Sequence, residues 1–161
     1  MELKDLFNKL TSYNIFNHLL PGATFCVIAE KVSELNLVQE NLINSVFVYY
    51  LIGMIISRIG SIVVEPILKL VKFVKFSEYE QYVIKSKEDT SLATLSEQNN
   101  TYRSLLTTFI LLLVVGNLDK VLNKYPWLDN NIQTITLISV VILLSFSYRK
   151  QTSYIKKRVE S

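Results

Sequence analysis

Ionisable and small polar side chains interrupt one long apolar stretch of the sequence, between positions 46 and 76. Arg58, Ser61 and Glu65 are spaced at i, i+3 and i+7, so they share one face if the segment is a helix. A charged group at membrane depth costs about 2.5–3.5 kcal/mol and usually faces protein or water. The spacing therefore predicts a pore vestibule, a gate or a polar subunit contact. Alternatively, Arg58 and Glu65 lie at the cytoplasmic headgroups, where they extend toward water or form an ion pair.

Two other groups of residues predict features of the helix backbone. Gly53, Ser57 and Ser61 recur every four residues, and small side chains at this spacing let two helices approach closely, within one chain or between subunits. The second group predicts a break that could line a cavity, although a simple kink or a helix start fits it as well. This group consists of Asn17, His18, Pro21 and Gly22.

No motif in the sequence predicts catalysis. The single histidine and the single cysteine lie eight residues apart and cannot supply a metal cluster, and Cys26 is expected to be a small buried apolar side chain. Zinc-protease, dithiol, nucleophile-elbow and phosphate-loop motifs are all missing. We therefore expect neither an enzyme nor a bound cofactor or metal.

The composition indicates an integral membrane protein. Half of the 161 residues are hydrophobic and only 19% are charged, against about 25% in globular proteins. The charges also cluster between long apolar runs, whereas a soluble amphipathic helix has them in every turn. A formal net charge of +3 does not indicate nucleic-acid binding. The predicted fold class is an all-α, polytopic membrane helical bundle.

The apolar runs predict about four transmembrane helices, preceded by an amphipathic helix at 1–12. The first is weak and kinked at its Pro-Gly pair, or else begins at Pro21 and ends near Leu37. The second is longer than a bilayer core of about 30 Å, so its basic C-terminal part emerges. The predicted transmembrane segments are 13–37, 42–66, 104–118 and 131–148, with a cytosolic connector at 67–103 and a basic tail at 149–161.

The connector is expected to be a small helical hairpin. Ser77 and Glu80 have the spacing of a capping box, which predicts a short helix as far as about Lys87. A second helix is expected to start at 89–91, and a break or a helix cap is expected at 99–101, before the third transmembrane segment. This hairpin is too small to be an independent catalytic domain.

The basic residues predict that both termini are cytoplasmic and that the chain crosses the inner (plasma) membrane. Of the 17 lysines and arginines, only Lys31, Lys120 and Lys124 fall in the two short loops on the opposite side. The bilayer is therefore one expected partner, and a cytosolic protein is another. The basic residues expected to contact anionic lipid or that protein are Lys69, Lys72, Lys75, Arg149, Lys150, Lys156, Lys157 and Arg158.

In size and layout the chain resembles small multi-pass membrane components of bacterial anti-phage defence systems, such as the Kiwa and Hailong kinds. The resemblance covers the four-span plan of the whole chain and the basic cytosolic surface. It implies an oligomeric membrane protein that works with a cytosolic sensor or a nucleotide-making enzyme. It also implies action by depolarisation or growth arrest, and it assigns a role to no individual residue.

Three functions fit these features. The first is a homo-oligomeric membrane channel or membrane-perturbing effector that a cytosolic partner controls. The second is a non-conducting membrane anchor or scaffold, whose cytosolic hairpin recruits a soluble enzyme. The third is a small exporter in which Glu65 carries the proton.

Overall fold

The structure, a computed structural model, describes residues 14–33 and 35–160, and all regular elements in these ranges are helical. The predicted amphipathic helix at 1–12 lies outside the described residues. The elements are the π-turn η1 (Ile15–Leu19), α3 (Leu20–Val32), α4 (Leu42–Ile59), the π-turn η2 (Gly60–Val64), α5 (Glu65–Leu70), α6 (Tyr79–Glu88), α7 (Ser91–Val115), α8 (Leu118–Lys124) and α9 (Pro126–Glu160). The predicted all-α fold is confirmed.

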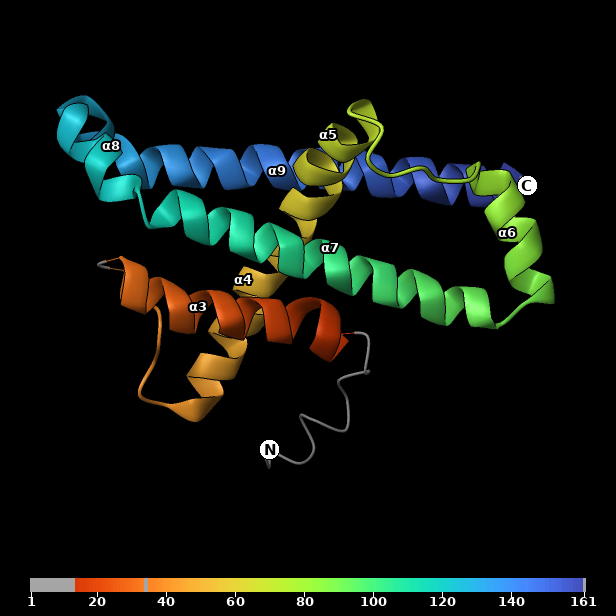
Figure 1. Cartoon of the computed structure of the whole chain (residues 1–161), viewed down its shortest axis with the longest axis horizontal. Coiled ribbons are helices and arrows are strands. Elements are labelled where there is room, and N and C mark those ends of the chain that lie inside the picture. The colour runs from red at the N-terminus through yellow and green to blue at the C-terminus, as the bar shows by residue number, and fades with distance from the viewer. Residues whose placement is uncertain (1–13, 34, 161) are drawn as a thin grey trace.

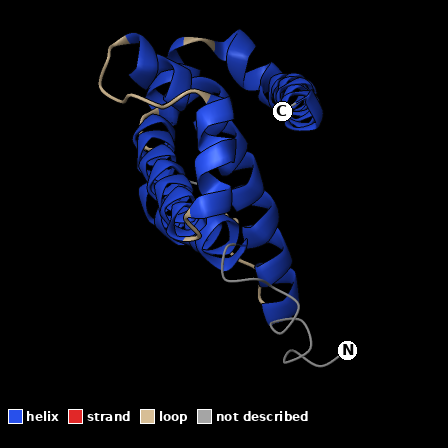
Figure 2. Ribbon diagram, turned by 90° about the vertical axis from the view of Figure 1, so that its right-hand side faces the viewer, coloured by secondary structure: helices blue, strands red, loops and turns tan. Residues whose placement is uncertain are grey.

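The helix α4 crosses the other long helices diagonally, while α3, α7 and α9 run in similar directions in the view of Figure 1. The helix α3 packs against both α4 and α7, so these three helices form the packed core. The helix α9 contacts α4 and η2 near its middle, and α8 and α6 near its two ends. Figure 2 shows α9 nearly end-on, with the C-terminus at its near end.

Two π-turns each precede a proline. In η1 the Leu20 amide donates to the Ile15 carbonyl, and in η2 the Glu65 amide donates to the Gly60 carbonyl, five residues back in each case. Proline has no amide proton and its ring crowds the carbonyl four residues before it. A wider turn just before Pro21 and Pro66 accommodates this crowding without ending the helix.

The predicted break in the first apolar segment is therefore wrong. The backbone stays helical from Asn14 to Val32, because the π-turn η1 absorbs the effect of Pro21. The helix also ends before the predicted Leu37, since Ser33 is extended (φ −151°, ψ 176°). The Ser33 hydroxyl donates to the Ala29 carbonyl at 2.7 Å, which pairs one of the last carbonyls of α3.

The second apolar segment is a continuous helix from Leu42 to Leu70, formed by α4, η2 and α5. Asn41 caps its start, with the side-chain oxygen accepting from the Ile43 and Asn44 amides. Lys72 ends it in the left-handed conformation (φ 59°), and the Phe73 amide returns to the Leu68 carbonyl. The basic segment is thus helical only as far as Leu70.

The connector differs from its prediction in two respects. The helix α6 begins at Tyr79 with Glu78 as its N-cap and no side-chain capping bond, so the predicted capping box is wrong. The helix α7 is continuous from Ser91 to Val115, so the predicted break at 99–101 is also wrong. Asparagine lowers helix propensity by only a few tenths of a kcal/mol, and packing of α7 on α3 and α4 outweighs that cost.

Within residues 14–33 and 35–160, two helices are long and apolar enough to cross a membrane, the continuous helix Leu42–Leu70 and α9. The two helices differ in burial. In the most apolar stretch of Leu42–Leu70, 33% is buried inside the protein, whereas in the most apolar stretch of α9 only 6% is buried. The helix α9 continues beyond the predicted boundary at 148, and the predicted basic tail is its last three turns.

Candidate functional site

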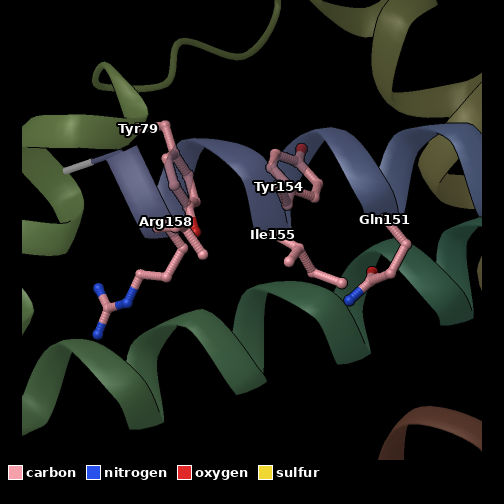
Figure 3. A pocket seen from close by; sticks show the side chains of 6 residues that line it. Tyr79, Gln151, Tyr154, Ile155 and Arg158 are labelled. Carbon is pink, nitrogen blue, oxygen red and sulfur yellow. The ribbon is translucent and has the colours of Figure 1, made fainter.

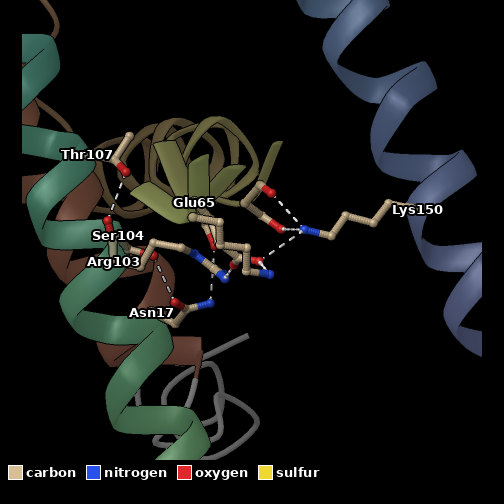
Figure 4. Close-up of polar contacts among 9 residues, drawn as sticks. Asn17, Glu65, Arg103, Ser104, Thr107 and Lys150 are labelled. Carbon is tan, nitrogen blue, oxygen red and sulfur yellow. Dashed lines mark hydrogen bonds and ion pairs between the residues drawn. The ribbon is translucent and has the colours of Figure 1, made fainter. Parts of the chain in front are cut away.

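Glu65 is a buried carboxylate in the first turn of α5, with only 6% of its surface exposed. Arg103 of α7 contacts it at 2.6 Å and Lys69 of α5 at 2.8 Å. Lys150 of α9 lies 3.8 Å from the same carboxylate. Three helices therefore meet at Glu65, as Figure 4 shows. We refer to Glu65, Lys69, Arg103 and Lys150 as the Glu65 cluster.

Lys150 also compensates for a hydrogen bond that Pro66 cannot make. In η2 the Glu65 amide donates to the Gly60 carbonyl, and Pro66 has no amide proton to donate to the Ser61 carbonyl. The Lys150 ammonium donates to that carbonyl at 2.6 Å and to the Ser61 hydroxyl at 2.8 Å. The π-turn and Pro66 thus leave the Ser61 carbonyl without a backbone donor, and Lys150 of α9 supplies a donor.

A second polar bridge lies deeper in the core. The Asn17 amide group donates to the Ser57 hydroxyl at 3.3 Å and accepts from the Ser104 hydroxyl at 2.9 Å. Only 1% of Asn17 is exposed, and Ser57 and Ser104 are buried as well. This side chain joins η1, α4 and α7 through paired polar groups, so it contributes to a closed interior rather than to an open cavity.

The predicted stripe of small residues is buried within the chain. A Cβ atom on Gly53 would overlap the His18 carbonyl, and one on Gly22 would overlap the Tyr49 carbonyl. The backbones of η1, α3 and α4 therefore touch where they cross. Ser57 faces Asn17 and Ser61 faces Lys150, so the stripe Gly53, Ser57 and Ser61 packs against helices of the same chain.

The structure brings together only two of the three residues that were predicted to share a polar face. Ser61 and Glu65 both contact Lys150. Arg58 is half-buried and, among the described residues, has no hydrogen bond or ion pair. The π-turn between positions 58 and 65 changes the rotation per residue, so the i, i+7 rule for an α-helix does not hold across it.

His18, next to Asn17, is a buried residue of η1. Its ring lies edge-on to Tyr50 of α4 with the ring centres 5.5 Å apart. Among the described residues no group of three or more metal-ligating side chains comes together, around His18 or elsewhere.

Sequence reasoning missed three polar residues of α7, namely Ser104, Thr107 and Thr108, all fully buried. The Thr107 and Thr108 hydroxyls donate to the Arg103 and Ser104 carbonyls at 2.8 and 3.0 Å. The sequence spacing could have predicted them, because Ser104 and Thr108 lie four residues apart and so share one face of an otherwise apolar helix.

The basic residues predicted to form a lipid or partner surface divide into two groups. Lys150 is half-buried in the Glu65 cluster, and Lys69, 44% exposed, contacts Glu65 and lies 4.1 Å from the centre of the Phe76 ring. The others are exposed: Lys72, Lys75, Arg149, Lys156, Lys157 and Arg158.

A shallow pocket of about 220 Å³ lies between α6 and the end of α9 (Figure 3). The rings of Tyr79 and Tyr154 stack there with their centres 5.3 Å apart. Arg158 and Gln151 also line it. The stack attaches α6 to α9 at the end of the molecule that is farthest from α8.

No family model matches the sequence, and no curated protein or solved structure is significantly similar to the chain.

Proposed function

We propose that the protein crosses the inner membrane four times, through η1–α3, α4, α7 and α9, with both termini in the cytoplasm. The arrangement of the helix ends supports this proposal. The α3–α4 connection and α8 lie toward one end of the molecule, and α6 and the C-terminus lie toward the other (Figure 1). Among the described residues, the basic ones at the first end are Lys31 in the last turn of α3 and Lys120 and Lys124 of α8, and so small a number is expected for the side opposite the cytoplasm.

We further propose that the protein is a homo-oligomer that acts as a channel or membrane-perturbing effector. The single observation that carries this proposal is the exposure of α9, of whose described side chains only Ser147 is buried. Lipid can cover an apolar helix, and the exposed surface of α9 is also available for packing against a neighbouring copy. Its large exposed apolar side chains include Leu137, Ile138, Val141, Ile142, Leu144 and Phe146.

The closed interior of the chain favours an assembly over a monomeric transporter. The buried polar groups Asn17, Ser57 and Ser104 are hydrogen-bonded to one another, and the backbones touch at Gly22 and Gly53. A water-filled path for ions would therefore form between copies, as in other small channel subunits, and not through one chain.

A cytosolic partner would control this activity, in keeping with the resemblance to membrane components of anti-phage defence systems. The pocket between α6 and α9 lies at the proposed cytosolic end, beside the exposed basic residues Lys156 and Lys157. A signal received there would reach the membrane through α9, because α9 runs from this pocket to α8.

The test combines stoichiometry with membrane potential. The full chain is reconstituted in liposomes for subunit counting by photobleaching, and it is expressed in bacteria alone and with its genomic neighbours while membrane potential and growth are followed. We expect several copies in each particle and depolarisation in at least one expression condition. A monomer that never changes the membrane potential would exclude the channel and effector functions.

A non-conducting scaffold is the second candidate, and the stacked pair Tyr79 and Tyr154 favours it because it fixes α6 as a defined cytosolic surface. In that case a soluble protein co-purifies with the chain, and Tyr79→Ala weakens the association while the membrane potential never changes. Tyr102→Phe, at an exposed position on α7, is the matched control.

A further inference from the structure

The Glu65 cluster contains more positive than negative charge. Lys69, Arg103 and Lys150 all contact the single carboxylate of Glu65, so two positive charges remain without a counter-charge in this network.

These three cations lie close together. Lys69 and Lys150 contact the same oxygen of Glu65, and Arg103 contacts the other oxygen. The side chains are also partly withdrawn from solvent, with exposed fractions of 17% for Arg103, 29% for Lys150 and 44% for Lys69. Like charges held together with limited hydration are unfavourable unless an anion compensates them.

The cations lie at equivalent places on three helices. Arg103 directly precedes the apolar part of α7, Lys150 follows that of α9, and Lys69 follows that of α4. In the proposed topology, each of these positions is the cytoplasmic boundary of the bilayer. Lipid phosphate groups lie at this depth, and basic sites between transmembrane helices on the cytoplasmic side suit them.

We propose that Lys69, Arg103 and Lys150 form a binding site for a phosphate group, supplied by an anionic phospholipid of the cytoplasmic leaflet. This inference rests on the proposed membrane topology. Lys69 is the most exposed of the three cations, and its ion pair with Glu65 within one helix is of the kind that contributes little, so its ammonium can also donate to a phosphate oxygen. Lys150 and Arg103 contribute charge while they keep their contacts with Ser61 and Glu65.

The experiment measures lipid preference in the full-length protein. The chain is reconstituted in nanodiscs that contain phosphatidylcholine alone or a mixture with phosphatidylglycerol, and bound lipid is identified by native mass spectrometry after release. We expect phosphatidylglycerol to be retained preferentially and Lys69→Gln to weaken its binding about fivefold. Lys87→Gln, an exposed lysine of α6 on the same proposed side, should leave the preference unchanged.

Two further measurements separate the possible outcomes. The rate of maleimide labelling at the buried Cys26 should be equal in Lys69→Gln and wild type, which shows that the variant is folded. Inorganic phosphate at millimolar concentration is added to the phosphatidylcholine sample. If inorganic phosphate stabilises the protein as much as phosphatidylglycerol does, the site binds free phosphate and the assignment to a lipid is wrong.

Equal phosphatidylglycerol binding by Lys69→Gln and Lys87→Gln would overturn the site itself. Carbonate extraction of the expressing membranes tests the topology separately. A chain that carbonate releases contradicts the proposed function, whereas an integral chain without lipid preference contradicts only this inference.

Discussion

Glu65 stabilises the fold by compensating cations that come from three helices. Its two oxygens contact Arg103 and Lys69 at 2.6 and 2.8 Å, and Lys150 lies slightly farther away. Removing one partner of a buried ion pair leaves the other charges without compensation, which is worse than removing the whole group. Glu65 is therefore a structural residue in the described state, whatever further role it has.

The substitution Glu65→Gln tests this role. We expect it to lower the free energy of unfolding by about 3–5 kcal/mol, because Arg103 and Lys150 keep their charge in a partly buried site. Thermal unfolding of the detergent-purified protein, followed by maleimide labelling of Cys26, measures the loss. Glu88→Gln is the control, since its ion pair with Lys85 is exposed on both sides and contributes little.

The same variant bears on the exporter hypothesis. If Glu65→Gln assembles and unfolds like the wild type but transports nothing, Glu65 acts as a proton carrier and its structural role is refuted. A variant that unfolds at much lower temperature and loses its assembly supports the structural role.

At the scale of the elements, α3 and α4 depend on glycine where they cross. The backbones touch at Gly22 and Gly53, so the crossing leaves no room for even a methyl group. The π-turns η1 and η2 lie close to this crossing in sequence and carry the polar residues that join the helices. Close packing and polar bridging thus occur along the same stretch of α4.

The substitution Gly53→Ala should separate these two helices. The added methyl group would overlap the His18 carbonyl, and overpacking of this kind costs about 1–3 kcal/mol. We expect a lower unfolding temperature and faster labelling of Cys26, which α3 carries on its buried face. Gly116→Ala, at an exposed position at the end of α7, should change neither quantity by much.

The start of α7 should respond to acid through Asp89. The Ser91 side chain and amide donate to the exposed Asp89 carboxylate, which lowers the pKa of Asp89 below its usual value. The group therefore stabilises this helix start at neutral pH, and the contribution is lost as the pH falls through the lowered pKa. The variant Asp89→Asn retains an acceptor at all pH values. At acidic pH, hydrogen exchange of the 89–95 segment should therefore be faster in the wild type than in Asp89→Asn. Equal exchange in both proteins would contradict this.

Much of the helical plan could be predicted from apolar runs, but the partners of Glu65 could not. Helical periodicity tells which residues share a face of one helix, and it indicated a polar face at positions 58, 61 and 65. Arg103 and Lys150 are 38 and 85 positions away from Glu65, and only the packing of α7 and α9 brings them to it. Pro21 correctly indicated an irregular backbone, but the choice between a break and a π-turn depends on tertiary contacts.

At the scale of the whole molecule, the chain consists of a packed core and one attached helix. The core is formed by α3, α4 and α7, each of which packs against the other two. The helix α9 is attached through Lys150, through the Tyr79–Tyr154 stack and through α8. In the proposed function, a cytosolic event would therefore change the membrane-facing surface through α9.

The proposed topology predicts the sides from which two engineered cysteines react. In a Cys26→Ser background, Lys124→Cys should react with a membrane-impermeant maleimide in spheroplasts. Ser153→Cys should react only after the membrane is permeabilised, because it lies on the cytosolic extension of α9. Both side chains are exposed, so burial does not limit the reaction. Labelling of both from the same side would contradict the four-span topology.

The wide turn Gly60–Val64 holds one residue more than an α-helical turn of the same rise. Deleting a single residue there would restore regular α-helical hydrogen bonding and leave the following helix at nearly the same rotation, because the wide turn accommodates one additional residue within a single turn. Glu65 would then still point toward Arg103 and Lys150. Chain length in this turn is therefore less constrained than the identities of Glu65 and its partners, and an alignment gap here is compatible with retention of the cluster.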